Sequence, residues 1–406
     1  MASASAHREC TCENGGGDGF FCGESQCTSD LCGTGACIET AAGPACDCPL
    51  GTGGLHCEID CSGPLEFSSE LEAVVRQNIG KGSGDILASE LENYTSLSAY
   101  DKGISDLSGL ECWTSLRTID LASNNLTDIS ALAGLSQLTS LNLNCNPIED
   151  LTPLSHLSRL TFLNLELYSH CPSDLPLPDL SPLGHLRKLT GLQIGGRKVG
   201  SIEPLGHLKQ LERLILVDVG ISDLSPLSDM HRLSVLYLYR NDITSIAPLL
   251  RAPWLLDLWL QENPLSSLDG LQRLPRLLEL EISEVGISES PVYSQLTRLH
   301  SLSAQRNGIV DAAPFGHLTE VAEIQLTDNE IEDIAPLAQL TRVKHLGLAS
   351  NKIKDLSPFV NNAEFGSSGS LAIGDNPLDC ETQTPHIQAL ESRGMTVWQG
   401  NGICPQ

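Results

Sequence analysis

The sequence predicts an α/β solenoid in which a parallel sheet lines the concave side and short helical turns line the convex side, after a small disulfide-rich module at the N-terminus. Two observations predict this fold. From Tyr94 to about residue 376, apolar residues, mostly Leu, recur with a period of 22 residues, and Asn recurs between them. Upstream of the repeats, ten of the 15 cysteines lie within residues 10–61.

Each repeat begins with a short strand. The unit LRTIDLASNNLTDISALAGLSQ places Ile119 and Leu121 two residues apart, so both face the core and their neighbours face outward. The copy that begins at Leu160 is 29 residues long and carries an insertion around residues 169–177. The repeats start at Tyr94, Leu116, Leu138, Leu160, Leu189, Leu211, Leu233, Leu255, Leu277, Leu299, Val321 and Val343, with a partial copy around Leu371.

The ninth position of the unit is usually Asn, whose amide both donates and accepts and therefore satisfies backbone groups at a buried turn. It is Asn124, Asn146, Asn241, Asn263, Asn307, Asn329, Asn351 and Asn376. In the remaining copies it is Lys102, Tyr168, Arg197, Val219 and Val285, where we expect altered turn geometry.

The second half of the unit often contains Ser-Pro-Leu or Ala-Pro-Leu, as at residues 225–227. Pro suits the first position of a helical turn, and the Ser before it is expected to cap that turn. Asp or Glu at the thirteenth position, as at Asp150 and Asp223, is expected to be solvated and to cap the turns. These features predict short helical turns on the convex side.

The recurring pattern LxxLxLxxNxIxDIxPLxxL resembles leucine-rich repeat proteins, of the 22-residue type found in bacterial internalins and in phosphatase regulators. It covers residues 94–376, or about 13 repeats. Residues 61–93 are expected to form a helical N-terminal cap, with apolar Leu71, Val74 and Val75, Ser69 as N-cap and Gly80 as the end of the helix. Residues 377–406 are expected to form a C-terminal cap of a short helix and a strand.

Six cysteines between residues 27 and 57, with Gly54 three residues before the last, resemble an epidermal-growth-factor-like (EGF-like) domain at residues 23–60. The spacing alone leaves fifteen connectivities open. The resemblance implies the pairs Cys27–Cys37, Cys32–Cys46 and Cys48–Cys57. Calcium-binding members carry an acidic motif that is missing here, so we expect no calcium site.

Upstream, Cys10, Cys12 and Cys22 resemble the end of a preceding EGF-like copy, and residues 1–22 are expected to be its remnant, with a Cys12–Cys22 pair. The partners of Cys10 and Cys61 stay open. No apolar secretory segment follows Met1, so we expect the start of the chain to be truncated. Disulfide-rich modules belong to oxidising compartments, which favours an extracellular or cell-surface location.

The remaining cysteines lie in the repeats and the C-terminal cap. Cys112, on a convex turn, is expected to be a buried free thiol. Cys145 and Cys171 lie near adjacent strands and are expected to form a disulfide if the insertion folds back. A Cys380–Cys404 disulfide would fasten the C-terminal cap to the last repeat.

Composition and motifs exclude several classes of function. With 51 acidic and 24 basic residues the net charge is −27, which disfavours nucleic acid as a partner. No run of 18 apolar residues exists, so no membrane span is expected. No nucleotide-binding, hydrolase or metalloprotease motif occurs, and we expect neither an enzyme nor a cofactor. His156, His185 and His207 recur at the nineteenth position and could hold zinc, but a turn position that tolerates His is favoured, and no metal site is predicted.

The outward strand positions carry the predicted binding surface. Although only 4% of residues are aromatic, three aromatic residues fall on the outward side of two adjoining strands. Tyr, Trp and Arg are enriched at interface hot spots, and internalin-like proteins grip a protein partner with concave aromatic residues. The alternative is that these rings only shield the strand backbone. The predicted partner-binding residues are Arg213, Tyr237, Tyr239, Arg240, Asp257, Trp259, Glu262, Glu279 and Glu281.

Two functions remain open from the sequence. The first is an extracellular or cell-surface recognition protein, whose leucine-rich repeats bind a protein, or alternatively a glycan, and whose EGF-like part is a spacer. The second is an intracellular regulatory scaffold that resembles the phosphatase-binding repeat proteins, which the disulfide pattern disfavours.

Overall fold

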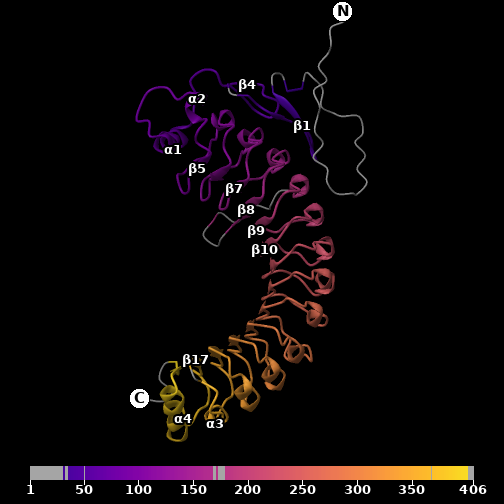
Figure 1. Cartoon of the computed structure of the whole chain (residues 1–406), viewed down its shortest axis with the longest axis vertical. Helices are drawn as coiled ribbons and strands as arrows, with labels where there is room; N and C mark the ends of the chain where they lie inside the picture. The colour runs from indigo at the N-terminus through magenta and orange to yellow at the C-terminus, as the bar shows by residue number, and fades with distance from the viewer. Residues whose placement is uncertain are drawn as a thin grey trace, which may run out of the picture. The chain divides into compact units, whose positions relative to one another are not determined.

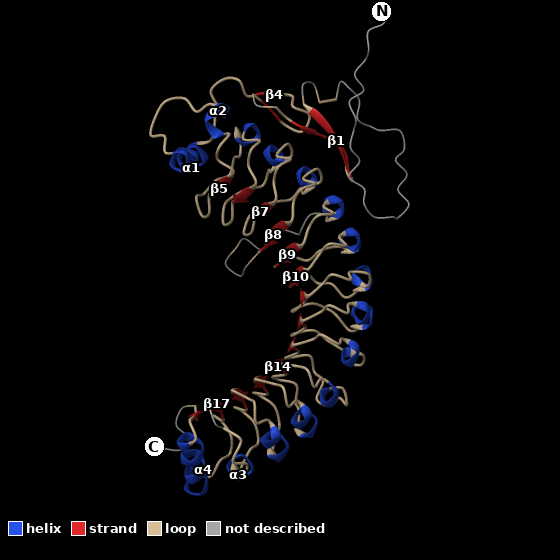
Figure 2. Ribbon diagram, in the orientation of Figure 1, coloured by secondary structure: helices blue, strands red, loops and turns tan. Residues whose placement is uncertain are grey.

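The computed structural model describes residues 31–32, 35–49, 51–167, 171, 179–366 and 368–400. The chain divides into two compact units, Met1–Leu211 and Glu212–Gln406. Within each unit, the repeats carry a short strand on one side and a short helical turn on the other (Figures 1 and 2). The expected leucine-rich repeat solenoid, with a parallel sheet and short helical turns, is therefore confirmed.

Unit 1 contains five parallel strands of the repeats. Partners in neighbouring strands are one repeat apart, as in the pair Leu97 and Ile119. The strands β8 and β9 keep this register across the insertion, because Leu163 pairs with Leu192. The strands are β5 (Ser96–Ser98), β6 (Thr118–Asp120), β7 (Ser140–Asn142), β8 (Phe162–Glu166) and β9 (Gly191–Gly195).

Unit 2 continues the same pattern with parallel strands in chain order. Inward residues such as Leu236 and Leu258 are fully buried and pair with each other in register. The strands are β10 (Arg213–Val217), β11 (Val235–Tyr237), β12 (Asp257–Trp259), β13 (Glu279–Glu281), β14 (Ser301–Ser303), β15 (Glu323–Gln325), β16 (His345–Gly347), β17 (Gly369–Ala372) and β18 (Met395–Trp398).

The helical turns are mostly short 3-10 segments, and Pro stands in the first turn of many of them. In unit 1 they are Leu110–Cys112, Ser130–Leu132, Thr152–Leu154, Ser181–His185 and Glu203–His207. In unit 2 they are Ser225–Leu227, Ala247–Arg251, Leu271–Arg273, Tyr293–Gln295, Ala313–His317 and Ala335–Gln339.

The expected capping role of the Ser before Pro is wrong. Ser225 is the first residue of its turn, and the residue that precedes the turn, Leu224, makes no side-chain capping bond. The capping acceptor is instead Asp223, whose Oδ1 accepts from the backbone N–H of Ser225 at 2.8 Å. The thirteenth-position carboxylates therefore cap the turns, as expected, because a carboxylate two residues upstream closes an Asx turn.

The recurring Asn side chains are buried and join neighbouring repeats, and Asn124 shows how. Its Oδ1 accepts from the backbone N–H groups of Lys102 at 3.1 Å and Ile104 at 2.9 Å, both in the preceding repeat. Its Nδ2 donates to the carbonyl oxygens of Ala99 and Leu121, each at 2.8 Å. One side chain thus satisfies backbone groups of two repeats, which supports the structural role expected for this ladder.

Where Asn is replaced at this position, the backbone still finds partners. The backbone N–H of Val219 donates to Asn241 Oδ1 of the following repeat at 3.1 Å. The N–H of Val285 donates in the same way to Asn307 Oδ1 at 2.9 Å. What these copies lose is the Asn side chain itself, which elsewhere accepts from N–H groups of the preceding repeat and donates to carbonyl oxygens.

Arg197, which replaces Asn in its repeat, bonds backbone groups with its guanidinium instead. It is 5% exposed, and its guanidinium donates at 3.0 Å to the carbonyl oxygens of Ile148 and Asn146, two repeats back. The long side chain thus reaches beneath the repeat that carries the insertion. Tyr168, the ninth residue of that repeat, lies outside the described residues.

The first repeat is covered by α1 (Ser69–Ile79), which is followed by the short α2 (Ala88–Leu91). Leu71 and Val75 on α1 are fully buried. Ser68, not Ser69, precedes the helix, and Gly80 ends it in a left-handed conformation with φ of 71°. These apolar residues are therefore buried where the helix contacts the first strand of the repeats, β5.

Unit 2 ends in α3 (Ser357–Asn361), α4 (Cys380–Ser392) and β18. Arg393 follows α4 and donates to the carbonyl oxygen of Val360 at 2.6 Å, which ties the helix to the last turn. Cys380 is disulfide-bonded, whereas its expected partner Cys404 lies outside the described residues.

The cysteine-rich segment contains two small antiparallel pairs. The strands β1 (Ala36–Thr40) and β2 (Gly43–Asp47) form one pair, and β3 (Thr52–Gly53) and β4 (Ile59–Asp60) form the other. The expected disulfides Cys32–Cys46 and Cys48–Cys57 are both present.

Part of the expected cysteine pattern falls on residues that the structure does not describe. Cys37 is disulfide-bonded, but Cys27, to which it was expected to bond, lies outside the described residues. Cys10 and the expected pair Cys12–Cys22 also lie outside the described residues. The whole remnant expected at residues 1–22 lies outside them as well.

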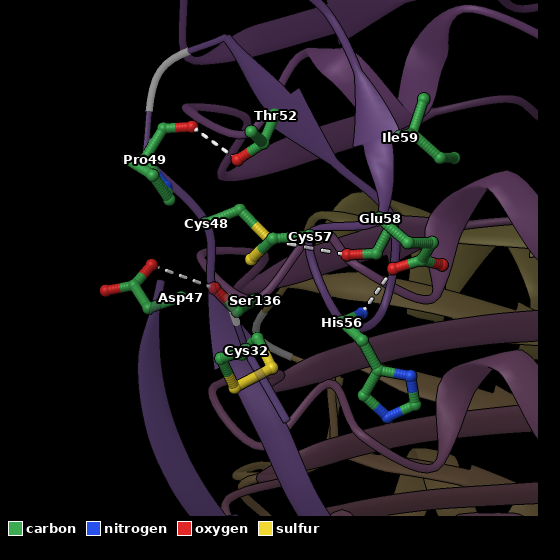
Figure 3. Close-up of a disulfide and its surroundings, with 12 residues drawn as sticks. Cys32, Asp47, Cys48, Pro49, Thr52, His56, Cys57, Glu58, Ile59 and Ser136 are labelled. Atoms are coloured by element: carbon green, nitrogen blue, oxygen red, sulfur yellow. Dashed lines mark hydrogen bonds between the residues drawn. A yellow bond between two sulfur atoms is a disulfide. The ribbon is translucent and has the colours of Figure 1, made fainter. Parts of the chain in front are cut away.

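The cysteine-rich segment packs against the turns of the first repeats. Asp47 accepts hydrogen bonds from Ser136 at 3.2 Å and Gln137 at 2.9 Å, and Figure 3 shows the former beside the Cys48–Cys57 disulfide. The backbones touch at Gly134, where an added Cβ would lie 2.2 Å from the carbonyl oxygen of Gly54. The segment is therefore docked on the first repeats of unit 1 and is not a free spacer.

The expectation that Cys112 is a free thiol is wrong. Cys112 forms a disulfide with Cys61, and both cysteines are buried, at 7% and 2% exposure. The bond fastens the end of the cysteine-rich segment to the first helical turn, which is why a cysteine occupies that turn. The expected Cys145–Cys171 disulfide is present and joins Cys171 in the fourth repeat to the third repeat.

No helix among the described residues is long and apolar enough to cross a membrane.

Candidate binding surface on the sheet of unit 2

Three aromatic side chains, Tyr237, Tyr239 and Trp259, gather on the outward side of β11 and β12; we call them the aromatic patch. The register of the parallel strands places Tyr237 directly beside Trp259. Their rings stack at 4.3 Å between centroids, with 20° between their planes, and Tyr239 lies 6.3 Å from Trp259 in a tilted arrangement. All three side chains are half-buried, so they form one contiguous apolar surface that solvent still reaches.

Tyr237 is fixed on both sides by charged groups. Its hydroxyl donates to Asp257 Oδ2 at 2.6 Å, and the guanidinium of Arg213 lies 5.1 Å from the centre of its ring. Burial, together with the hydrogen bond to Asp257, raises the pKa of Tyr237 to about 12. Tyr237 is therefore neutral at physiological pH and held in one orientation, which lowers the ordering cost of binding a partner.

Acidic residues flank the aromatic patch on β13. Glu281 is the register neighbour of Trp259, and Glu279 is the register neighbour of Asp257. Burial raises the pKa of Glu279, and the neighbouring carboxylates of Asp257 and Glu323 raise it further. Like charges on adjoining strands destabilise each other, so a cationic group of a partner would stabilise this side of the surface.

The remaining predicted residues, Arg240 and Glu262, bind each other. The Arg240 Nε lies 2.9 Å from Glu262 Oε1, and both residues have left-handed backbones where their strands end. The two predicted residues therefore lie together at one end of the surface, where their charges offset each other.

The structure adds one residue to the predicted surface and shows that two outward positions beside it are covered. Gln261, beside Trp259, has a buried Oε1 that finds no hydrogen-bond donor among the described residues, and the same is true of Asp257 Oδ1. Ile215 and Val217, which occupy outward positions of β10, are only 6% and 8% exposed. The repeat register gives the direction of a side chain but not the extent to which its neighbours cover it.

The histidines of the nineteenth position do not form a metal site. His156 is partly buried, and this burial lowers its pKa, with smaller contributions from His56 and His185. Among the described residues, no group of three or more His, Cys, Asp or Glu side chains is arranged to hold a metal ion.

The repeats, their register and the buried Asn ladder make the fold a leucine-rich repeat solenoid. A family model for leucine-rich repeats in two copies matches residues 114–156. A comparison with curated protein sequences found no match.

Solved structures share the fold. The internalin InlF from Listeria monocytogenes is 26% identical, with a TM-score of 0.62 over 83% of this chain and 90% of that one. The functional domain of InlJ from Listeria monocytogenes is 21% identical, with a TM-score of 0.56 over 80% and 77%. The plant peptide hormone receptor RGFR1, solved in complex with RGF2, is 19% identical, with a TM-score of 0.51 over 72% and 53%.

Proposed function

We propose that this protein is an extracellular or cell-surface recognition protein that binds a protein partner on the outward, concave side of its sheet, without catalysis. The observation that carries the proposal is the aromatic patch. Three contiguous aromatic side chains face away from the core in a chain in which only 4% of residues are aromatic. Aromatic and Arg side chains at the centre of a surface are the usual anchors of protein interfaces.

The disulfides support the location. Four disulfides are present among the described residues, and they hold together parts of the chain that pack weakly without them. They are Cys32–Cys46, Cys48–Cys57, Cys61–Cys112 and Cys145–Cys171. Such bonds persist in oxidising compartments and are rare in the cytosol. They favour this function over that of an intracellular scaffold of the phosphatase-binding kind. The likeness to the internalin InlF points the same way.

We further propose that residues 23–60 form an EGF-like module and that residues 61–93 and 377–406 are the caps of repeats 94–376. The disulfides Cys32–Cys46 and Cys48–Cys57 and the small hairpins support the module. Its docking on the first turns makes it part of one compact unit with the first repeats.

The test compares the wild type with a variant in which Tyr237, Tyr239 and Trp259 are all Ala. A partner captured by the wild type from surface or secreted proteins is purified, and its affinity for both forms is measured by calorimetry. We expect the variant to lose about 2 kcal/mol or more of binding free energy, because the anchors of an interface carry most of it.

The matched control changes Ser301, Gln305 and Gln325 to Ala on the neighbouring strands β14 and β15 and is expected to bind like the wild type. Equal affinity of the wild type and the aromatic variant would refute the proposed surface.

A further inference from the structure

Charge is segregated between the two edges of the repeats in unit 2. The residues that follow each strand are mostly acidic, and the cations among them are neutralised. Arg306 pairs with Glu284 at 2.7 Å and with Asp328 at 3.1 Å, and Lys352 pairs with Glu330 at 2.9 Å. Lys354 pairs likewise with Glu332 at 2.6 Å.

The opposite edge, where each helical turn leads into the next strand, is basic between Arg232 and Arg298, whereas beyond it Arg342 is paired with Glu320. We call five residues there the arginine edge: Arg232, Arg251, Arg273, Arg276 and Arg298. All five are exposed, and none forms an ion pair with a carboxylate of the described residues. The chain has a net charge of −27, so five unpaired arginines along one edge form a local positive patch on an acidic protein.

Because of the repeat period, side chains recur at the same position along this edge. Arg232, Trp254, Arg276 and Arg298 each stand three residues before a strand, in four successive repeats. Arg232, Arg276 and Arg298 share this position with Trp254, and Arg251 and Arg273 repeat three residues upstream of it. Because neighbouring strands lie about 4.8 Å apart, the cations recur at short intervals along the edge. The guanidinium of Arg276 lies 4.1 Å from the centre of the Trp254 ring, and this cation–π contact orients the Arg276 side chain.

We propose that the arginine edge binds a linear sulfated polysaccharide. An Arg guanidinium offers paired donors that match the oxygens of a sulfate or carboxylate, and a periodic row of them matches a polymer with periodic anions. Binding would also relieve the repulsion among the unpaired arginines. This site is separate from the aromatic patch and goes beyond the function proposed above.

Other polyanions fit this edge less well. Single-stranded nucleic acid requires several aromatic platforms for its bases, whereas the edge carries only Trp254, and Arg276 covers one of its faces. A flat anionic membrane would also approach the exposed acidic residues Glu212, Asp229 and Glu320 around the ends of the edge. A thin, flexible chain touches the edge alone.

The test uses immobilised heparin as the probe, with binding of the full chain measured by interferometry at several NaCl concentrations. The test variant changes Arg251, Arg273 and Arg276 to Gln. It is expected to bind at least about tenfold more weakly than the wild type, and the slope of log affinity against log salt should be about three units shallower, because three cations no longer displace counterions.

The matched control changes Arg306, Lys352 and Lys354 to Gln on the acidic edge. It loses the same net charge but is expected to keep affinity within about twofold, since these cations are already paired with carboxylates. A third variant, with Arg251, Arg273 and Arg276 changed to Lys, should keep the salt slope but bind several-fold more weakly, because it retains charge and loses the paired donors.

The proposal is overturned if the wild type does not bind heparin at low salt, or if the two Gln variants lose affinity equally. It is also overturned if unsulfated heparosan binds as tightly as heparin. Tighter binding of single-stranded DNA or of phosphatidylserine vesicles, lost in the arginine-edge Gln variant, would assign the edge to one of those ligands instead. All the substituted side chains are exposed, so thermal unfolding should match the wild type in each variant.

Discussion

At the scale of single residues, the stability of each repeat depends on a few buried polar side chains. Asn124 is 5% exposed and satisfies backbone groups of two repeats, whereas its neighbour Asn125 is exposed. A change of Asn124 to Ala leaves buried N–H and C=O groups without partners. We expect the free energy of unfolding to fall by about 2 kcal/mol or more, because each unsatisfied buried group costs about 1–3 kcal/mol.

Urea denaturation followed by circular dichroism measures this loss, and Asn125 changed to Ala is the matched control, expected to lie within about 0.5 kcal/mol of the wild type. Equal midpoints for the two variants would show that the ladder is not needed for stability.

The carboxylates that cap the turns make the protein sensitive to acid. The backbone N–H of Ser225 and then its hydroxyl lower the pKa of Asp223, and the Ser357 hydroxyl and backbone N–H lower the pKa of Asp355, both from 3.8. A depressed pKa in the folded state contributes stability above the unfolded pKa, and that contribution is lost as the pH falls through the folded value. We therefore expect the melting temperature to fall as the pH drops below 4.

The comparison is with a variant in which Asp223 and Asp355 are both Asn, which keeps an acceptor for the turn but cannot titrate. Its melting temperature should fall less between pH 5 and pH 2 than that of the wild type. Parallel curves for the two proteins would contradict the assigned role.

At the scale of elements, the contact between the cysteine-rich segment and the repeats depends on two backbones touching. Any side chain at Gly134 would collide with the carbonyl of Gly54, since even a Cβ would lie 2.2 Å from it. We expect Gly134 changed to Val to increase hydrogen exchange in residues 51–60, while the Cys61–Cys112 disulfide still holds the segment to the first repeat.

Exchange is measured by mass spectrometry on peptides from the intact chain. Gly200 changed to Val is the control, because an added Cβ there meets no atom within 4 Å. Unchanged exchange in the Gly134 variant would mean that the segment is not docked as described.

The strands and turns could be predicted from the sequence because each follows from a local rule that the repeats copy many times. The alternation around Ile119 and Leu121 sets the strand, and Pro226 sets the turn. The Cys61–Cys112 disulfide could not be predicted, because it depends on where the cysteine-rich segment docks. The path of Arg197 to a carbonyl two repeats away is non-local in the same way.

At the candidate site too, the local features could be predicted from the sequence and the non-local contacts could not. The register predicted that Tyr237 and Trp259 would adjoin and face outward, and they stack at 4.3 Å. The pairing of Arg240 with Glu262 and the burial of Ile215 depend on rotamers and neighbours, which a sequence period does not specify.

At the scale of the whole molecule, repeats that contact only their neighbours leave long surfaces free for different ligands. In unit 2, the outward side of the sheet carries the aromatic patch, and the edge where turns lead into strands carries unpaired arginines. We propose that a protein partner occupies the first surface and a sulfated polysaccharide the second. The chemistry of the two surfaces differs enough for each to be removed by mutation without disturbing the other.

The central claim is that a protein partner covers the aromatic patch. Hydroxyl-radical footprinting of the purified complex measures it most directly, because oxidation of each Trp and Tyr reports its solvent exposure. We predict that partner binding protects Trp259, Tyr237 and Tyr239, while the exposed Trp254, at 49%, and Trp398, at 63%, are oxidised as in the free protein. Unchanged oxidation of Trp259, with protection of Trp254 or Trp398 instead, would contradict the account.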